Sequence, residues 1–104
     1  MSKQVAIVED DEVISMLISR GIKNQTGISA DQYSTFAALE KSGKKYDLYV
    51  LDNDTGETVQ GVNVAKKNPQ NSIIYSSDTG LEFDPYFEKT NTSGLLSYIK
   101  SFFK

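Results

Sequence analysis

Cysteine and histidine are both absent from the 104 residues of the chain. Without cysteine there is no disulfide and no thiolate ligand, and without histidine there is no imidazole for acid–base or zinc chemistry. These absences exclude serine–histidine hydrolases, cysteine proteases, zinc fingers and most transition-metal sites. The chemistry that remains is that of carboxylates, hydroxyls and lysines, which suits hard cations and phosphoryl groups.

Long apolar runs and an excess of positive charge are also missing. No segment approaches the roughly 18 consecutive apolar residues of a membrane-spanning helix, and the first residues do not resemble a secretory signal. The net charge of −3 argues against a nucleic-acid-binding surface. The length supports one core. We therefore expect a single domain over residues 1–104 that is cytoplasmic and has neither nucleic acid nor a membrane as a partner.

Short apolar segments with the character of strands recur along the chain. Three clear segments cover 5–8, 46–51 and 72–76, a weaker alternating segment covers 28–33, and a last short strand begins at Tyr86. A continuous apolar run of this length is typical of a strand that is buried on both faces of a sheet.

Helical spacing of apolar residues occupies the intervals between these segments. The predicted helices run from a cap at Asp11 to Gly27, from a cap at Ser34 or Thr35 to about Gly43, over 59–67 before Pro69, and from a cap at Ser93 to the C-terminal phenylalanines. Strands that alternate with helices imply crossover connections. The chain is therefore predicted to form a doubly wound α/β fold, with a mostly parallel sheet and helices on both faces.

Ligands of such sheets bind beyond the carboxyl ends of the strands. The residues predicted at those ends are Glu9 and Asp10, Asp52, Ser76 and Lys89. Three carboxylates gathered at one edge would repel one another, and Mg²⁺, which prefers oxygen ligands, would relieve that repulsion. With Lys89 added, the site would be ready for an anion. If that anion is a phosphoryl group, Asp52 would be its nucleophile, and Lys89 and the Ser76 hydroxyl would contact its oxygens.

The same segments resemble the response-regulator receiver domain family (CheY-like). The segment 5–12 is similar to its first strand and acidic pair, 46–52 to the strand that ends in the phosphoacceptor aspartate, 73–77 to the strand that ends in a hydroxyl, and 86–89 to the strand that delivers the lysine. The resemblance covers nearly the whole chain. It implies a five-stranded parallel sheet in the order 2-1-3-4-5.

The resemblance also implies roles for these residues. Asp52 would accept a phosphoryl group from a histidine kinase or a histidine phosphotransfer protein. Asp10 and Asp52 would bind Mg²⁺ directly, Glu9 would bind it through water, and the backbone carbonyl of Asp54 would add a ligand.

A switch and a mode of signalling follow from the same resemblance. Ser76 would turn toward the phosphoryl group, and Tyr86 matches the aromatic residue whose rotamer follows that hydroxyl. A stand-alone receiver of this kind would not be an enzyme beyond its own phosphoryl transfer and autodephosphorylation. It would signal by binding a downstream protein or by passing the phosphoryl group along a relay.

The interval between Ser76 and Lys89 departs from the family pattern. It is too short for the family's fourth helix, and it contains Gly80 and Pro85, so we expect a loop there. Leu81 or Phe83 is expected to cover the apolar patch that the missing helix would bury. Thr90 replaces the proline that usually follows the lysine, which argues against a cis peptide at that position.

Two alternatives remain open at the level of sequence. One is a pseudo-receiver, a binding module of the same fold that is not phosphorylated. The shortened helices favour it, whereas the complete set of site residues argues against it. The other is a small α/β domain whose acidic residues only cap helices and do not respond to Mg²⁺. A haloacid-dehalogenase-type phosphatase is disfavoured, because nothing acidic follows the Lys89 strand at the expected place and the chain is too short for a cap domain.

Overall fold

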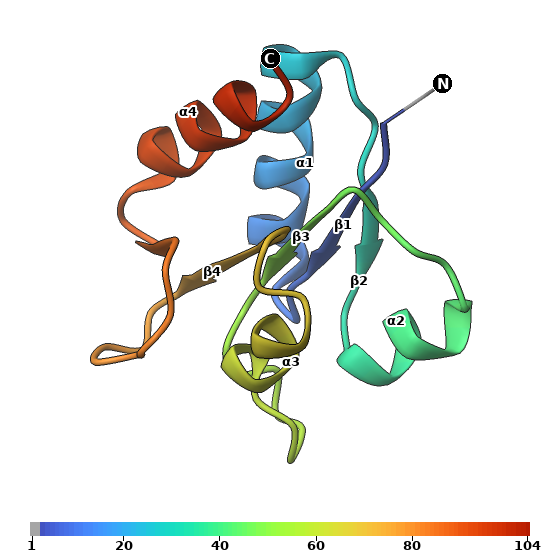
Figure 1. Ribbon diagram of the computed structural model, residues 1–104, viewed down its shortest axis with the longest axis vertical. Coiled ribbons are helices and arrows are strands. Elements are labelled where there is room, and N and C mark those ends of the chain that lie inside the picture. The colour runs from blue at the N-terminus through green and yellow to red at the C-terminus, as the bar shows by residue number, and fades with distance from the viewer. Residues whose placement is uncertain (1–2) are drawn as a thin grey trace.

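A five-stranded sheet lies between two layers of helices in the computed structural model, which describes residues 3–104 (Figure 1). The elements in chain order are β1 Val5–Val8, α1 Glu12–Thr26, β2 Asp31–Tyr33, α2 Phe36–Ser42, β3 Leu48–Leu51, α3 Gly61–Lys67, β4 Ser72–Ser76, β5 Tyr86–Glu88 and α4 Thr92–Phe102. All strand pairs are parallel, in the order β2-β1-β3-β4-β5. The predicted doubly wound α/β fold is confirmed. Within residues 3–104, every helix is too short or too polar to cross a membrane.

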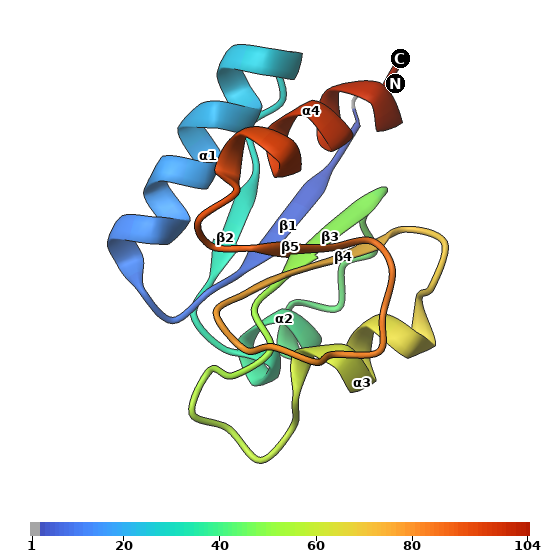
Figure 2. The ribbon, with the colours of Figure 1, turned by 90° about the vertical axis from the view of Figure 1, so that its left-hand side faces the viewer.

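Apolar side chains fill the space on both faces of the sheet. Figure 2 shows α1 and α4 on one side of the strands and α2 and α3 on the other. The first layer packs Ile18, Ile22, Leu95 and Ile99 against Val5, Ile7, Leu48, Val50 and Ile73. The second layer packs Phe36, Leu39 and Ala65 against Ala6, Val8, Leu51 and Ile74. Because β1 and β3 are covered on both faces, every residue of these strands is buried, which explains their continuous apolar sequences.

The first helix begins and ends where the sequence predicts. The Asp11 carboxylate accepts hydrogen bonds from the amides of Val13 (3.0 Å) and Ile14 (3.2 Å), which caps the N-terminus of α1. Gly27 ends the helix with φ of 77°, a left-handed conformation that glycine adopts without strain. Because Asp11 directly follows the acidic pair Glu9 and Asp10, this cap fixes the direction in which the chain leaves the carboxyl end of β1.

Four predicted boundaries are wrong by two or three residues. The β2 strand begins at Asp31 rather than residue 28, and its pairing with β1 starts with Asp31 opposite Ala6. The β3 strand begins at Leu48 rather than 46, because the amide of Tyr46 donates to the Tyr49 hydroxyl instead of to a neighbouring strand. The α3 helix begins at Gly61 rather than 59. The cap of α4 is Asn91, whose side chain accepts from Gly94, and not Ser93.

A loop over residues 77–85 replaces the family's fourth helix, as expected. No helix or strand is assigned between β4 and β5. Leu81 and Phe83 are half-buried and pack against the core cluster on the α2 and α3 face, so they cover the patch as predicted. The cis peptide of the described chain joins Asp84 to Pro85, and the bond before Thr90 is trans.

The N-terminus of α2 is closed by side chains from two segments. Thr35, not Ser34, is the capping residue, and its hydroxyl accepts from the amide of Ala38 at 3.0 Å. Glu57, from the loop between β3 and α3, accepts from the amides of Phe36 (2.7 Å) and Ala37 (3.1 Å). Burial acts to raise the pKa of Glu57, but the hydrogen bonds from Thr55 and from these two amides outweigh it and hold the pKa below its ordinary value. The loop that follows β3 is thereby fastened to α2.

Replacing Glu57 with alanine is expected to lower the free energy of unfolding at neutral pH by about 1 kcal/mol, as for the loss of a helix cap. Because the folded-state pKa is lowered, this contribution is present above the ordinary value of 4.5 and is lost as the pH falls through the folded-state pKa. Urea unfolding of both proteins between pH 7 and pH 3 measures the difference. Glu40→Ala, an exposed position in α2, is the control. A difference that stays constant down to pH 3 contradicts the role of the carboxylate.

Candidate functional site

The parallel sheet brings acidic residues of two neighbouring strands to one edge. In the register of β1 and β3, Val8 pairs with Leu51, so Glu9 and Asp52 leave the two strands side by side. Both carboxylates are buried, with 3% and 4% of the residue surface exposed, whereas Asp10 is exposed. One carboxylate oxygen from each of Glu9, Asp10 and Asp52 lies within 4.8 Å of the other two. Three acidic groups thus converge at the carboxyl end of the sheet, as the sequence analysis expected.

Lys89 reaches the same site from the edge strand of the sheet. It follows β5, and its Nζ lies 2.7 Å from Glu9 Oε1 and 3.3 Å from Asp52 Oδ2. These ion pairs join residues that are 80 and 37 positions apart in the chain, so the folded sheet alone brings them together. One ammonium faces three carboxylates, and the site therefore keeps an excess of negative charge.

The titration of the site follows from this crowding. Burial first, and the neighbouring Asp52 second, raise the pKa of Glu9 to about 8 against the opposing effect of Lys89. Burial acts to lower the pKa of Lys89, but its two carboxylate partners outweigh that effect and raise it above its ordinary value. Lys89 is therefore cationic at neutral pH, and Glu9 is the group that would hold a proton in the absence of a cation.

The donor set fits a hard divalent cation. Glu9 Oε2 is buried and has no hydrogen-bond partner, an arrangement that is costly unless a water or an ion satisfies it. Clustered carboxylate oxygens with one exposed member, Asp10, are the ligands that Mg²⁺ and Ca²⁺ take in proteins. Among residues 3–104, this is the single group of three or more acidic side chains close enough to share one metal ion.

The other predicted site residues lie around this group. The Asp54 side chain is exposed and accepts from the amide of Gly56 at 2.9 Å, so its carboxylate stays outside the cluster, and the role of its backbone carbonyl stays a prediction. Ser76 is buried at the end of β4, and its Oγ accepts from the amide of Asp78 at 3.0 Å. Tyr86 is half-buried and its hydroxyl donates to the backbone carbonyl of Asp78. Both predicted switch residues thus contact Asp78.

Two further residues, Asn53 and Gly61, support the site and were not assigned from the sequence as its supports. Asn53 is buried directly after Asp52, and its side chain donates to Asp78 Oδ2 at 2.7 Å and accepts from the amide of Val62 at 3.1 Å. A Cβ on Gly61 would lie 2.1 Å from the backbone oxygen of Asp52, so α3 approaches the peptide of the acidic residue as closely as glycine permits. The polar residue after Asp52 and the glycine at the helix start were visible in the sequence, but their partners are defined only by the fold.

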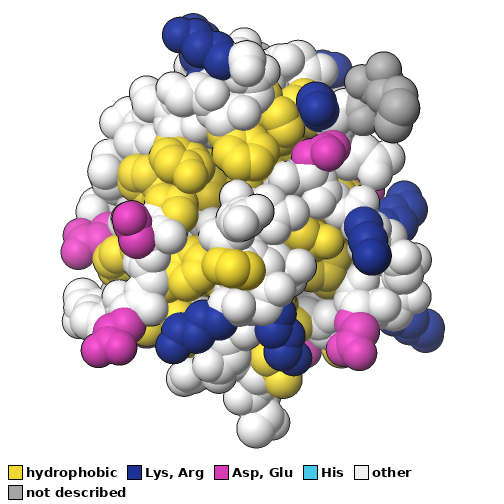
Figure 3. Space-filling model, in the orientation of Figure 1, with side chains coloured by type: hydrophobic (Ala, Val, Ile, Leu, Met, Phe, Trp, Pro, Cys, Tyr) yellow, Lys and Arg dark blue, Asp and Glu magenta, His cyan; other side chains and the backbone are white. Residues whose placement is uncertain are grey.

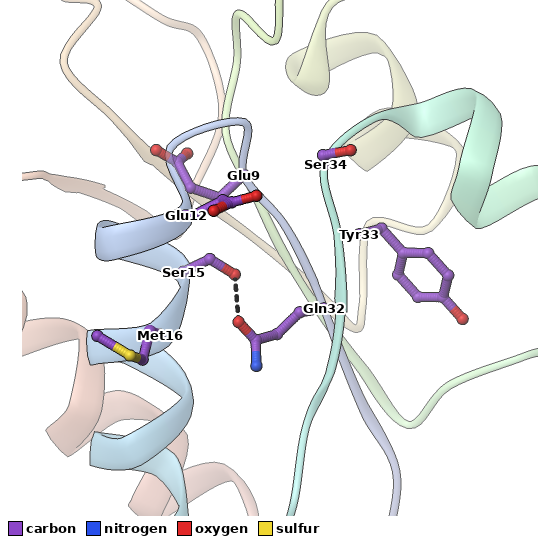
Figure 4. A pocket seen from close by; sticks show the side chains of 7 residues that line it. All are labelled: Glu9, Glu12, Ser15, Met16, Gln32, Tyr33 and Ser34. Atoms are coloured by element: carbon purple, nitrogen blue, oxygen red, sulfur yellow. Dashed lines mark hydrogen bonds between the residues drawn. The ribbon is translucent and has the colours of Figure 1, made fainter.

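A groove of about 570 Å³ opens beside the acidic group, between the start of α1 and the end of β2. Figure 4 shows Glu9, Glu12, Ser15 and Met16 on one side and Gln32, Tyr33 and Ser34 on the other. The Ser15 hydroxyl donates to Gln32 Oε1 at 2.9 Å and closes the floor of the groove, whereas the ring of Tyr33 points away. Of the three acidic residues, Glu9 lines this groove.

Comparisons with known proteins point to one kind of structure. Protein-family models and curated protein sequences gave no match to the chain. Among solved structures, the chain is similar to the BeF3-activated DrrB receiver domain, with 20% identity, a TM-score of 0.79, and coverage of 99% of this chain and 98% of that one.

Two further solved structures show the same likeness. The response regulator TrrA from Thermotoga maritima, in complex with Mg²⁺-BeF, has 20% identity, a TM-score of 0.76, and coverage of 96% of this chain and 98% of its own. The N-terminal domain of a response regulator/sensory box/GGDEF protein from Carboxydothermus hydrogenoformans has 25% identity, a TM-score of 0.72, and coverage of 95% and 91%. The chain has the fold of a CheY-like response-regulator receiver domain, as its sequence resemblance predicted.

Proposed function

We propose that this protein is a phosphoacceptor receiver of a two-component phosphorelay, in which Asp52 accepts a phosphoryl group from a histidine kinase or a histidine phosphotransfer protein. The observation that carries the proposal is that Lys89 forms ion pairs with both Glu9 and Asp52 inside a group of three carboxylates. A domain whose acidic residues served only as helix caps would have no reason to bury two of them against one lysine. The receiver fold and its structural neighbours support the same function.

The reaction is a transfer of the phosphoryl group between two nucleophiles. An oxygen of the Asp52 carboxylate attacks phosphorus, an O–P bond forms, and the P–N bond to the donor imidazole breaks with its electron pair left on nitrogen. The Lys89 ammonium, already 3.3 Å from Asp52 Oδ2, stabilises the incoming phosphoryl oxygens. The hydroxyl of Ser76 donates to another of them. Later attack of water on phosphorus restores the carboxylate and releases inorganic phosphate.

Glu9, Asp10 and Asp52 would hold Mg²⁺, with the backbone carbonyl of Asp54 as a further ligand. When bound, Mg²⁺ supplies the positive charge that lets an anionic phosphoryl group approach three carboxylates. The buried, unpartnered Glu9 Oε2 supports this assignment from the protein side. The neighbour TrrA was solved as a complex with Mg²⁺-BeF, which supports it by analogy.

An exposed apolar strip on α1 borders two grooves that contain residues of the site. It consists of Val13, Met16 and Leu17, which are 60%, 40% and 55% exposed and follow one another at helical spacing. Met16 lines the groove beside Glu9, and Leu17 lines a second groove of about 350 Å³ that also contains Lys89. A phosphodonor protein that placed an apolar helix face on this strip would bring its phosphohistidine to Asp52.

The central test is phosphorylation by a small phosphodonor. In acetyl phosphate with Mg²⁺, intact mass is expected to show the addition of one phosphoryl group to the parent chain and none to Asp52→Asn. The variant removes the nucleophilic carboxylate and is nearly isosteric. A known receiver domain treated in parallel shows that the donor is competent. If the parent chain gains no mass while that control does, the pseudo-receiver, a binding module of the same fold, is the correct interpretation.

The α1 strip is tested by comparing two donors. In Leu17→Ser, the rate of phosphotransfer from a histidine phosphotransfer protein that phosphorylates the parent chain is expected to fall about tenfold relative to the rate with acetyl phosphate, because an apolar contact is lost. Val13→Ser should act in the same direction. Val59→Ser changes a valine of similar exposure in the loop before α3 and should leave the ratio unchanged. Equal ratios in all four proteins contradict docking on α1.

A further inference from the structure

One residue of the loop that replaces the missing helix contacts three different parts of the site. Asp78 uses its carboxylate, its amide and its carbonyl for separate hydrogen bonds. Oδ2 accepts from Asn53 at 2.7 Å, the amide donates to Ser76 Oγ at 3.0 Å, and the carbonyl accepts from the Tyr86 hydroxyl. The residue therefore connects the loop after β3, the end of β4 and the start of β5.

The hydrogen bond from the Asp78 amide uses the oxygen of the Ser76 hydroxyl and leaves its proton free. Ser76 is buried, with 1% of its surface exposed, and its Oγ acts as the acceptor for the amide of Asp78. A hydroxyl that accepts through its oxygen keeps its proton for another partner. The proton of Ser76 is thus available to donate to a phosphoryl oxygen on Asp52, provided that the amide of Asp78 stays in place.

The carboxylate of Asp78 is what keeps that amide in place on the side of the acidic group. Its partner Asn53 is buried and is itself held by the amide of Val62 at the start of α3. The backbone of α3 in turn lies against the Asp52 peptide at Gly61. Without the bond to Asn53, the first residues of the 77–85 loop would be attached to the site only through backbone groups.

We infer that Asp78 is a positioning residue for phosphoryl transfer, which acts by holding the Ser76 hydroxyl in the orientation that donates to the phosphoryl group. The inference rests on the proposed function and adds to it a residue outside the metal and phosphoryl contacts. It also gives the shortened 77–85 loop a function at the site, which is to hold Asp78 against Ser76. An acidic residue is unexpected next to a site that receives an anion, since its charge alone would oppose the reaction. Its three hydrogen bonds give this residue a role that its charge does not.

The test compares rates of phosphorylation by acetyl phosphate at saturating Mg²⁺. Asp78→Ala is expected to lower the rate constant about tenfold, because a positioned donor is lost. Its dissociation constant for Mg²⁺, followed by tyrosine fluorescence, should stay within about twofold of the parent value, since the three carboxylates are untouched. Asp78→Asn keeps an oxygen that can accept from Asn53 and should restore most of the rate.

Two controls separate the loss of the Asp78 contacts from the loss of its negative charge and from unfolding of the variant. Glu82→Ala removes an exposed acidic side chain of the 77–85 loop, and any effect of lost negative charge appears in it as well. Because removing negative charge favours an anionic donor, a purely electrostatic role predicts that Asp78→Ala is faster than the parent. Circular dichroism establishes that each variant is folded at the temperature of the assay, and Asp78→Asn provides the comparison if Asp78→Ala is not.

The pathway through Ser76 is tested by a double-mutant cycle. If Asp78 acts through that hydroxyl, Asp78→Ala should cause no further loss of rate in a Ser76→Ala background. Additive losses, or an unchanged rate in Asp78→Ala, overturn the inference while leaving phosphorylation of Asp52 intact. A parent chain that accepts no phosphoryl group overturns the proposed function, and the inference with it.

Discussion

The crowding of three carboxylates at one sheet edge is the constraint on which the rest of the site depends. Glu9 and Asp52 are buried beside each other because β1 and β3 are neighbours in register, and Asp10 follows directly. Two buried acids in contact would destabilise the fold if nothing offset their charge. Lys89 offsets part of it through two ion pairs, and the charge that is left over is what the proposed divalent cation would neutralise. Burying the carboxylates lowers the stability of the fold, whereas the proposed function needs them together. Lys89 reduces that loss of stability by pairing with two of them.

The fold meets this constraint with rigid elements. The β1 and β3 strands are buried on both faces, so the peptides that carry Glu9 and Asp52 have little freedom to separate. Asp11 caps α1 immediately after the acidic pair, and Glu57 fastens the loop that follows Asp52 to α2. On the face of the molecule in Figure 3, apolar patches are interrupted by both basic and acidic side chains. The concentrated negative charge at the carboxyl edge thus arises from the order of the strands, which places their acidic ends together.

Much of this arrangement could be predicted from the sequence because its signals are local or periodic. The apolar runs at 5–8 and 72–76, the cap at Asp11 and the glycine at 27 each determine a boundary through nearby residues alone. The position of the acidic residues followed from the rule that parallel strands end at one edge. The predicted start of β3 failed at Tyr46 because its amide donates to the Tyr49 hydroxyl instead of to a neighbouring strand.

The supporting residues could not be assigned for a related reason. Asn53 contacts Asp78, which is 25 positions away, and Gly61 contacts Asn53 across the loop after β3. No sequence pattern identifies Gly61 as the residue that lets α3 approach a backbone oxygen. The loss of the family's fourth helix was visible as a short interval. That one residue of the remaining loop, Asp78, would bond Asn53 through its side chain and Ser76 and Tyr86 through its backbone required the folded chain.

The central claim is that Glu9, Asp10 and Asp52 form one cation site, and calorimetric titration with Mg²⁺ measures this most directly. The account predicts a single saturable site in the parent protein, binding that is weakened strongly in Asp10→Asn and Asp52→Asn, and unchanged binding in Asp84→Asn, an exposed acidic position of the 77–85 loop. Binding that is absent from the parent protein, or equally strong in all four proteins, would contradict it.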